Sequence, residues 1–141
     1  MRQTSYLDAL DYLNQALHMT NNDYSYLNSL HLKAKTLFKL DKKTEASHCV
    51  HLGIKLAKLV TNQRFMYKFN ILVHQIKGTT DQREFVTKLE NEMLAYFEQN
   101  ERKGDYYQCL ELLADIFYRR KHYKKSSDYY KTLYHLSKLA S

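Results

Sequence analysis

The stretch of sequence that decides the fold is LELLADIFYRRKHYKKSSDYYKTL, residues 110–133. Apolar and aromatic residues recur in it at three- and four-residue spacing, which is the spacing of one face of an α-helix. The spacing is interrupted at residues 120–122, so the stretch predicts two helices that are joined by a short turn and pack as antiparallel neighbours. The residues that define the pattern are Leu110, Leu113, Ala114, Phe117, Tyr123, Ser126, Tyr130 and Leu133.

The same order of large and small residues occurs a second time, earlier in the chain. Its members are Leu30, Ala34, Leu37, Ala46, Val50 and Gly53. Lys33 departs from the pattern, because a large apolar residue is usual at its position. The order is that of the tetratricopeptide repeat, in which each hairpin has a face that only a neighbouring hairpin can bury. A generic helical bundle with an accidental pattern is the alternative.

The composition favours helices along the whole chain. There is no proline and there are three glycines among 141 residues, and these two residue types break helices most often. We predict an all-α fold of tetratricopeptide-like antiparallel hairpins, stacked in a right-handed superhelix that forms a single domain over residues 1–141. The seven predicted helices span residues 6–19, 24–40, 43–60, 63–76, 82–100, 105–119 and 123–139.

Several residues predict where these helices start and stop. Asp41 is a predicted cap for the third helix, and Asn62 is expected to start the fourth. Gly78 is a predicted C-terminal stop, and Lys103-Gly104 is expected to separate the fifth helix from the sixth. Capping-box spacing occurs twice, in Thr79 with Gln82 and in Asp81 with Glu84.

Two helices carry packing predictions of their own. Gly53 lies in the middle of the third helix, where glycine costs about 1 kcal/mol relative to alanine. Close approach of a neighbouring helix would explain its use there. The fifth helix is expected to bury one face made of Phe85, Leu89, Met93 and Tyr96.

The first predicted helix, residues 6–19, matches the second half of a hairpin and lacks a first-half partner. We therefore expect either that the chain is the C-terminal part of a longer array or that a second copy covers the open face in a homodimer. An exposed apolar face of this kind commonly marks an interface. The predicted interface residues are Tyr6, Leu10, Leu13 and Leu17.

Charge and cysteine content bear on the partners and the compartment. The formal net charge is +7, which favours acidic partners in general, but the basic residues are scattered along the chain. Cys49 and Cys109 are far apart in the sequence and predict two free thiols in a reducing cytosol. The chain shows no apolar signal core and no run of roughly 18 apolar residues, so we expect a cytoplasmic protein with no membrane partner.

Five short runs carry a family resemblance. They are LKAKTLFKL at 32–40, TEA at 44–46, HLGIKLA at 51–57, LADIFY at 113–118 and HYKKSSDYY at 122–130. Together they resemble the later repeats of the Rap phosphatase regulators and of the related NprR and PlcR type transcription factors of Gram-positive bacteria. The resemblance covers most of the chain. It implies the sensor part of a cytoplasmic quorum-sensing protein, which binds a short signalling peptide and acts on transcriptional regulation through a separate output domain.

In such stacks the first helix of each hairpin lines a concave groove. Asparagine can pair with peptide backbone groups, aromatic side chains offer apolar contact, and Lys35 or Arg119 could hold a terminal carboxylate. Simple exposure of a polar helix face is the alternative for each residue. The predicted peptide-binding residues are Asn28, His31, Lys35, Phe38, Tyr67, Asn70, Ile71, His74, Gln108, Glu111, Asp115, Tyr118 and Arg119.

Other functions have weaker signals. The sequence has no nucleophile elbow, phosphate-binding glycine loop or zinc-protease motif, so we expect a binding protein rather than an enzyme, and no cofactor. His48, Cys49 and His51 have no second ligand pair nearby, so no metal site is expected. An assembly scaffold and a basic adaptor for nucleic acid or an acidic protein remain as alternatives. We disfavour nucleic acid because Tyr123 and Tyr130, which could stack on bases, are assigned to repeat packing.

Overall fold

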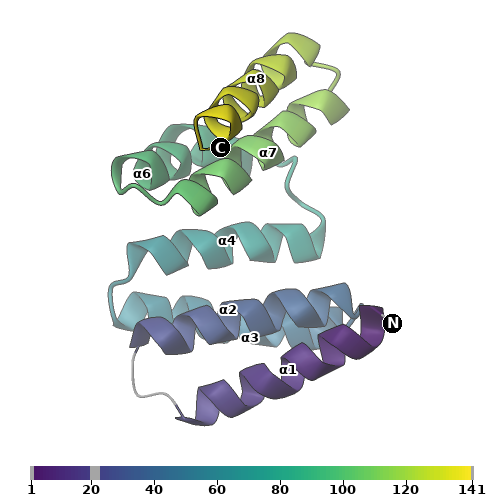
Figure 1. The fold of residues 1–141 in the computed structure, drawn as a ribbon, viewed down its shortest axis with the longest axis vertical. Helices are drawn as coiled ribbons and strands as arrows, with labels where there is room; N and C mark the ends of the chain where they lie inside the picture. Colours follow the sequence, from purple (N-terminus) through teal and green to yellow (C-terminus); the bar gives the residue numbers. More distant parts are fainter. Residues whose placement is uncertain (1, 20–22, 141) are drawn as a thin grey trace. The chain divides into compact units, whose positions relative to one another are not determined.

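The structure, a computed structural model, describes residues 2–19 and 23–140. Its elements are α1 (Arg2–Met19), α2 (Asp23–Lys39), α3 (Lys43–Leu59), α4 (Gln63–Lys77), α5 (Arg83–Lys88), the π-helix η1 (Leu89–Met93), α6 (Leu94–Gln99), α7 (Lys103–Arg119) and α8 (Tyr123–Ala140) (Figure 1). The described residues contain no strand, which confirms the predicted all-α fold. Because α5, η1 and α6 form one continuous helix, the predicted number of seven helices is also confirmed.

Contacts divide the chain into two compact units, Met1–Thr79 and Thr80–Ser141. In the first unit α1 packs on α2, α2 on α3 and α3 on α4. In the second unit α7 packs on α6 and on α8. The turns between successive helices within each unit are short, and helices joined by short turns are antiparallel neighbours. A continuous array over residues 1–141 and a right-handed superhelix remain predictions.

One turn conformation joins four pairs of successive helices. Its central residue is Asp41, Thr61, Glu101 or Lys121, each with a left-handed φ between 54° and 63°. In every case the next residue donates its backbone N–H to the carbonyl five positions earlier, as Lys42 does to Leu37 at 2.9 Å. This bonding pattern satisfies the last carbonyls of the preceding helix. The turns therefore depend on backbone hydrogen bonds and not on a particular side chain.

These turns recur at a fixed interval. Asp41 and Thr61 lie 20 positions apart, and so do Glu101 and Lys121. A helix of 17 residues and a turn of three fill each interval in α3 and α7. A complete hairpin therefore occupies about 40 residues, which is longer than the 34 residues of a standard tetratricopeptide repeat.

The helix ends confirm some of the capping predictions and contradict others. Asn62 caps α4, because its side-chain oxygen accepts from the Phe65 N–H at 3.1 Å. Gly78 ends α4 with a left-handed φ of 69°. Asp41 does not cap α3, since it is the left-handed residue of the preceding turn and Lys42 occupies the N-cap position.

The expected start of the fifth and sixth helices was partly wrong. Gln82 is the N-cap of α5 and makes no side-chain cap hydrogen bond, so neither capping box forms there. The break before α7 falls at 100–102, where Glu101 turns the chain. Gly104 instead lies in the first turn of α7, a position where helical hydrogen bonding does not yet depend on the residue's own N–H.

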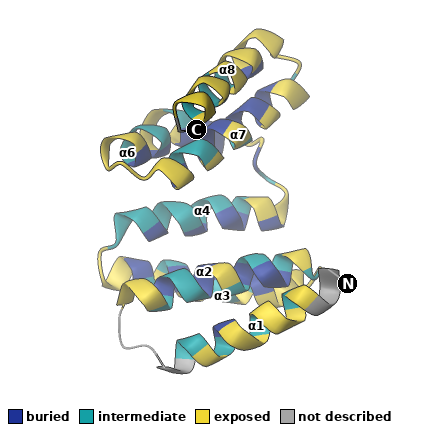
Figure 2. Ribbon diagram, in the orientation of Figure 1, coloured by how far each residue is buried: buried dark blue, intermediate teal, exposed yellow. Residues whose placement is uncertain are grey.

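The small residues of the repeat pattern lie where helices meet. All five are buried, namely Ala34, Ala46, Gly53, Ala114 and Ser126 (Figure 2). The Ser126 hydroxyl donates to the Ala114 carbonyl at 2.7 Å, so this contact between α7 and α8 is a hydrogen bond as well as a close approach. At Gly53 an added Cβ would lie 2.3 Å from Cζ of Phe69 on α4. The predicted close packing at Gly53 is therefore confirmed.

The fifth predicted helix contains a feature that was not expected. Phe85, Leu89 and Met93 are buried as predicted, but the fourth buried residue is Phe97 and not Tyr96. Four-residue spacing exceeds the α-helical turn by about 40° at each step, so three steps would carry Phe97 far from the face of Phe85. The π-helix η1 (Leu89–Met93) takes up one extra residue and returns the later residues to the same face.

The apolar face of α1 packs on α2 and is only partly open to solvent. Leu13 is 8% exposed, and Leu10 and Leu17 pack against the core of the first unit. Tyr6 is also partly buried. The expected interface residues therefore contact the first unit itself, and their contact with a second copy stays a prediction. A homodimer through α1 remains a prediction, and the large exposed apolar side chains of this helix are Leu7 and Tyr12.

Candidate peptide-binding surface

Helices α2 and α4 lie side by side and run in the same direction. Tyr24, near the start of α2, contacts Phe65, near the start of α4, with ring centroids 5.5 Å apart. His31, two turns further along α2, contacts Phe69, one turn further along α4, at 5.2 Å. Both phenylalanine rings are fully buried. These edge-to-face contacts hold α2 and α4 together within the first unit.

Basic side chains cover the solvent side of this aromatic cluster. The guanidinium of Arg64 lies 5.5 Å from the Tyr24 ring and 5.4 Å from the Phe65 ring, and it donates a 2.8 Å hydrogen bond to the Tyr24 hydroxyl. The ammonium of Lys68 lies 5.1 Å from the Phe65 ring. Cation–π contacts of this kind orient the cations. The sequence pattern did not identify Tyr24, Arg64 or Lys68 as site residues.

The predicted residues of α2 share one stripe of the helix. Tyr24, Asn28, His31, Lys35 and Phe38 follow one another at three- and four-residue spacing, so all lie within about 40° of the line through Tyr24. Asn28 and Lys35 are partly exposed on this stripe. His31 is only 7% exposed, and Phe38 packs against the core of the first unit. The prediction that His31 is open to a ligand is therefore wrong, because it fills the space between α2 and α4.

The predicted residues of α4 do not share the side that contacts α2. Tyr67, Asn70, Ile71 and His74 are all partly exposed. Asn70 is five positions from Phe65 and thus about 140° round the helix from the contact with α2. The Nδ1 atom of His74 lies 2.7 Å from the Thr79 hydroxyl at the end of α4. Ile71 is the predicted α4 residue nearest the line through Arg64.

The predicted residues of α7 belong to the second unit. They lie on one exposed face of the helix, which consists of Gln108, Glu111, Asp115, Tyr118 and Arg119. Arg119 forms an ion pair with Asp115 at 2.9 Å. Both side chains are more than half exposed, so this pair contributes little to stability, but it occupies the cation that was expected to hold a carboxylate. Lys35 remains for that role.

We define the α2–α4 surface by Tyr24, Asn28 and Lys35 on α2 and by Arg64 and Lys68 on α4. Three of its five residues are cationic, one is an amide and one is a phenol, and none is acidic. Arg and Lys bind carboxylates through charge-assisted hydrogen bonds, and an asparagine side chain both donates and accepts. The chemistry of the surface therefore suits a polar segment that carries a carboxylate.

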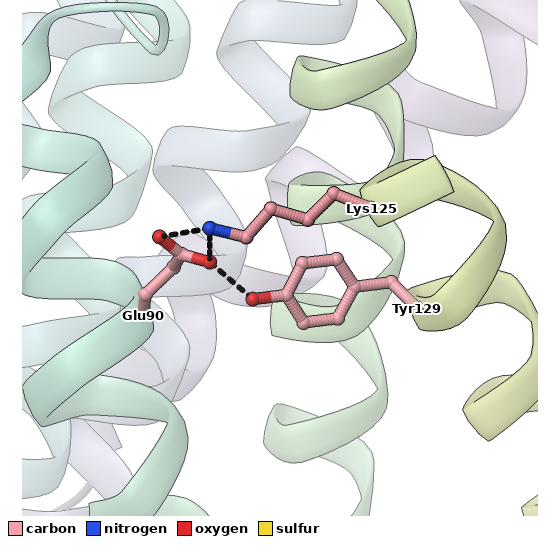
Figure 3. A network of polar contacts seen from close by, with 3 residues as sticks. All are labelled: Glu90, Lys125 and Tyr129. Atoms are coloured by element: carbon pink, nitrogen blue, oxygen red, sulfur yellow. Dashed lines mark hydrogen bonds and ion pairs between the residues drawn. The ribbon is translucent and has the colours of Figure 1, made fainter. Parts of the chain in front are cut away.

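A second polar cluster lies in the other unit and joins η1 to α8 (Figure 3). The carboxylate of Glu90 forms an ion pair with the ammonium of Lys125 at 2.9 Å and accepts a hydrogen bond from the hydroxyl of Tyr129. The Tyr129 ring stacks on Phe117 of α7 with centroids 6.1 Å apart. The sequence analysis did not identify Glu90 as a residue of any site. The π-helix, which no spacing rule predicted, is the element that carries this carboxylate.

This cluster makes a prediction for alkaline pH. Burial, followed by the hydrogen bond to Glu90, raises the pKa of Tyr129 above the ordinary value of 10.0. Its contribution to stability is therefore complete below pH 10 and is lost as the pH rises through the folded-state pKa. In Glu90→Gln the neutral amide repels tyrosinate less, so we expect Tyr129 to titrate closer to its ordinary value. Tyrosinate absorbance measured against pH tests this.

The matched control for that titration is Glu98→Gln. Burial and a hydrogen bond to Glu98 raise the pKa of Tyr106, so this variant should act mainly on Tyr106. Because Tyr106 is the smallest of the causes that raise the pKa of Tyr129, Tyr129 should change much less than in Glu90→Gln. Identical alkaline titration curves for Glu90→Gln and the unmodified protein would contradict the assignment.

Tyr123 and Tyr130 do not pack in the way the repeat pattern predicted. Their exposed fractions are 56% and 46%. Ser126 is the only buried residue of α8 among those described, and Tyr129 takes the place expected for Tyr130 by stacking on Phe117. Ser126 and Tyr129 make the contact of α8 with α7. Tyr123 and Tyr130 lie about 60° and 40° round the helix from Ser126, on the exposed flank of that contact.

The described residues contain neither a disulfide nor a cluster of metal ligands. Cys49 and Cys109 are both free, as predicted. Burial raises the pKa of Cys109 to about 12 and also raises that of Cys49, so neither thiol is activated as a nucleophile. Within residues 2–19 and 23–140, no three His, Cys, Asp or Glu side chains gather as metal ligands, and no helix is both long and apolar enough to cross a bilayer.

Comparisons with known proteins identify no relative. The resemblance of the repeats to peptide-pheromone receptors therefore remains a prediction. No protein-family model, curated protein sequence or solved structure matches the chain.

Proposed function

We propose that the chain is a helical-hairpin scaffold that binds a short linear peptide, or an extended segment of a protein, along the α2–α4 surface. The observation that carries the proposal is the parallel packing of α2 and α4, with Tyr24, Arg64 and Lys68 held in one cluster. Cations oriented against aromatic rings are preorganised for a ligand, which reduces the entropy lost on binding.

The polarity of the surface indicates how a peptide would bind. Asn28 and Lys35 continue the stripe that starts at Tyr24, so a peptide lying along α2 would meet an aromatic ring, an amide and an ammonium in turn. The amide can pair with peptide backbone groups. The ammonium can pair with a terminal or side-chain carboxylate.

The narrower proposal is that this scaffold is the sensor part of a bacterial signalling-peptide receptor. Its support is the resemblance of residues 32–57 and 113–130 to the repeats of such receptors. Peptide binding would then act by population shift, favouring the arrangement of hairpins that binds the peptide more tightly. An output domain of such a receptor would lie outside these 141 residues.

Calorimetric titration with a library of short linear peptides tests the proposal. We expect saturable binding with a dissociation constant near 1 μM, about −8 kcal/mol, that is lost in Asn28→Ala and weakened by amidation of the peptide C-terminus. Asn70→Ala is the matched control, because Asn70 is a partly exposed asparagine of the same unit on the opposite side of α4. Absence of saturable binding, together with a dimer in light scattering, would instead favour an assembly scaffold.

A further inference from the structure

The exposed part of α8 presents two parallel rows of side chains, of which the first borders the contact with α7. Tyr123, Tyr130 and Tyr134 form the first row, with exposed fractions of 46% to 56%. These three residues lie within about 20° of one line along the helix. All three rings are open on the surface, and Figure 2 shows how much of α8 is exposed.

The second row consists of lysines at seven-residue spacing. Lys124, Lys131 and Lys138 are exposed, and each lies one or four positions after a tyrosine of the first row. Seven residues are close to two helical turns and advance about 10 Å along the axis. The ammonium of Lys138 lies 5.0 Å from the Tyr134 ring. The two rows therefore run side by side along the length of α8.

The surface continues across the turn onto the end of α7. Tyr118 is 60% exposed, and its ring contacts that of Tyr123 at 5.5 Å. The turn itself carries Arg120 and Lys121. The surface thus combines four exposed tyrosines with a row of cations that extends past the start of α8.

Acidic residues near this face are few. Asp128 is the only carboxylate of α8; it lies about 140° round the helix from Tyr123 but only about 40° from Lys124, next to the lysine row. Glu90 is bound by Lys125 and Tyr129 on the inner side of α8. On α7, Asp115 is paired with Arg119. The exposed side of α8 thus carries three lysines of this row and one carboxylate, and it is net positive.

We infer that this face binds single-stranded nucleic acid. Tyrosine rings that are open on a surface provide platforms on which unpaired bases stack, and a flanking row of lysines neutralises the phosphates. Base stacking accepts every base, so little sequence preference is expected. In a duplex the base faces are covered, so single strands should bind more tightly than duplexes.

The observed exposure of the α8 tyrosines removes the argument from the sequence against nucleic acid. That argument assigned Tyr123 and Tyr130 to repeat packing, whereas both are about half exposed and the contacts of α8 with α7 are made by Ser126 and Tyr129. The inferred site lies wholly within the second unit and is independent of the α2–α4 surface. Either surface can be disabled by substitution while the other is kept.

Fluorescence anisotropy with a labelled single strand of about 15 nucleotides tests the aromatic row. Each of Tyr123→Leu, Tyr130→Leu and Tyr134→Leu should weaken binding about tenfold, while Tyr130→Phe should retain it because the ring remains. All three positions are exposed, so the variants should keep the helical circular dichroism of the unmodified protein. Equal affinities for the leucine variants and the unmodified protein would overturn the inference.

The salt dependence of binding tests the lysine row. Neutralising three lysines as Lys124→Gln, Lys131→Gln and Lys138→Gln should reduce the slope of log K against log salt by about 2, at about 0.7 per phosphate contact. The control is the same change at Lys43, Lys55 and Lys58, exposed lysines of α3, which alters net charge equally. If the control weakens binding as much, or if polyglutamate binds as tightly as the oligonucleotide, the face is not a nucleic-acid site.

Discussion

Replacement of Gly53 by alanine is expected to lower the free energy of unfolding by about 2 kcal/mol. The new Cβ would lie 2.3, 2.5 and 2.6 Å from three atoms of the Phe69 ring, which is fully buried and contacts His31 on its other side. The steric cost therefore exceeds the roughly 1 kcal/mol that alanine gains over glycine in a helix. Urea unfolding followed by circular dichroism measures the difference.

The other two glycines provide matched controls. At Gly104 an added Cβ meets nothing within 4 Å, so Gly104→Ala should be neutral or stabilising. At Gly78 the space is also open but φ is +69°, so Gly78→Ala should cost about 1 kcal/mol through the left-handed backbone. In a Gly53→Ala, Phe69→Leu double variant the two losses should not add, because the smaller side chain makes room. Additive losses, or a stable Gly53→Ala protein, would show that the contact with Phe69 is not tight.

Deletion of Asn91 from η1 is expected to leave the second unit folded, whereas deletion of Glu111 from α7 should unfold it. The π-helix holds one residue more than regular α-helix. Removing exposed Asn91 would bring Phe85, Leu89, Met93 and Phe97 to spacings of four, three and four, which share one face without a π-turn. We expect a change in stability within about 1 kcal/mol.

The contrast with Glu111 arises from the regular geometry of α7. Deletion there would rotate Leu113, Ala114 and Phe117 by about 100° relative to the start of the helix and remove them from the core. Burial lost at Leu113 and Phe117 alone is worth several kcal/mol, comparable with the whole stability of a small domain. Thermal unfolding of both variants makes the comparison. If both deletion variants are unfolded, then η1 is itself required for folding and does more than return the later residues of the helix to the buried face.

The sequence sufficed to predict elements that depend on local spacing. All seven helices lie within about four residues of their expected bounds at each end, because the apolar periodicity and the short connections both follow from neighbouring residues. The burial of Ala34, Ala46, Gly53, Ala114 and Ser126 followed from the repeat pattern in the same way.

Features that depend on the rotation of a helix about its own axis could not be predicted. The choice between Tyr96 and Phe97 depends on a π-turn whose cost is offset by tertiary packing. Tyr129 packs on α7 where Tyr130 was expected to pack. The two residues are one position, or about 100°, apart on the helix, so the prediction buried the wrong tyrosine. The site residues Arg64 and Lys68 were missed because their significance comes from Tyr24 and Phe65, which the pattern treated as ordinary positions.

One left-handed turn conformation joins successive helices at four places in this protein, at Asp41, Thr61, Glu101 and Lys121. Each turn is closed by backbone hydrogen bonds alone, and its central residue is exposed. The segment from Thr61 to Glu101 contains two helices and is bounded by this turn at both ends. We expect a chain built in this way to gain or lose such a segment of about 40 residues without a change in the turns, whereas deletion of one residue from a regular α-helix such as α7 rotates part of its buried face out of the core.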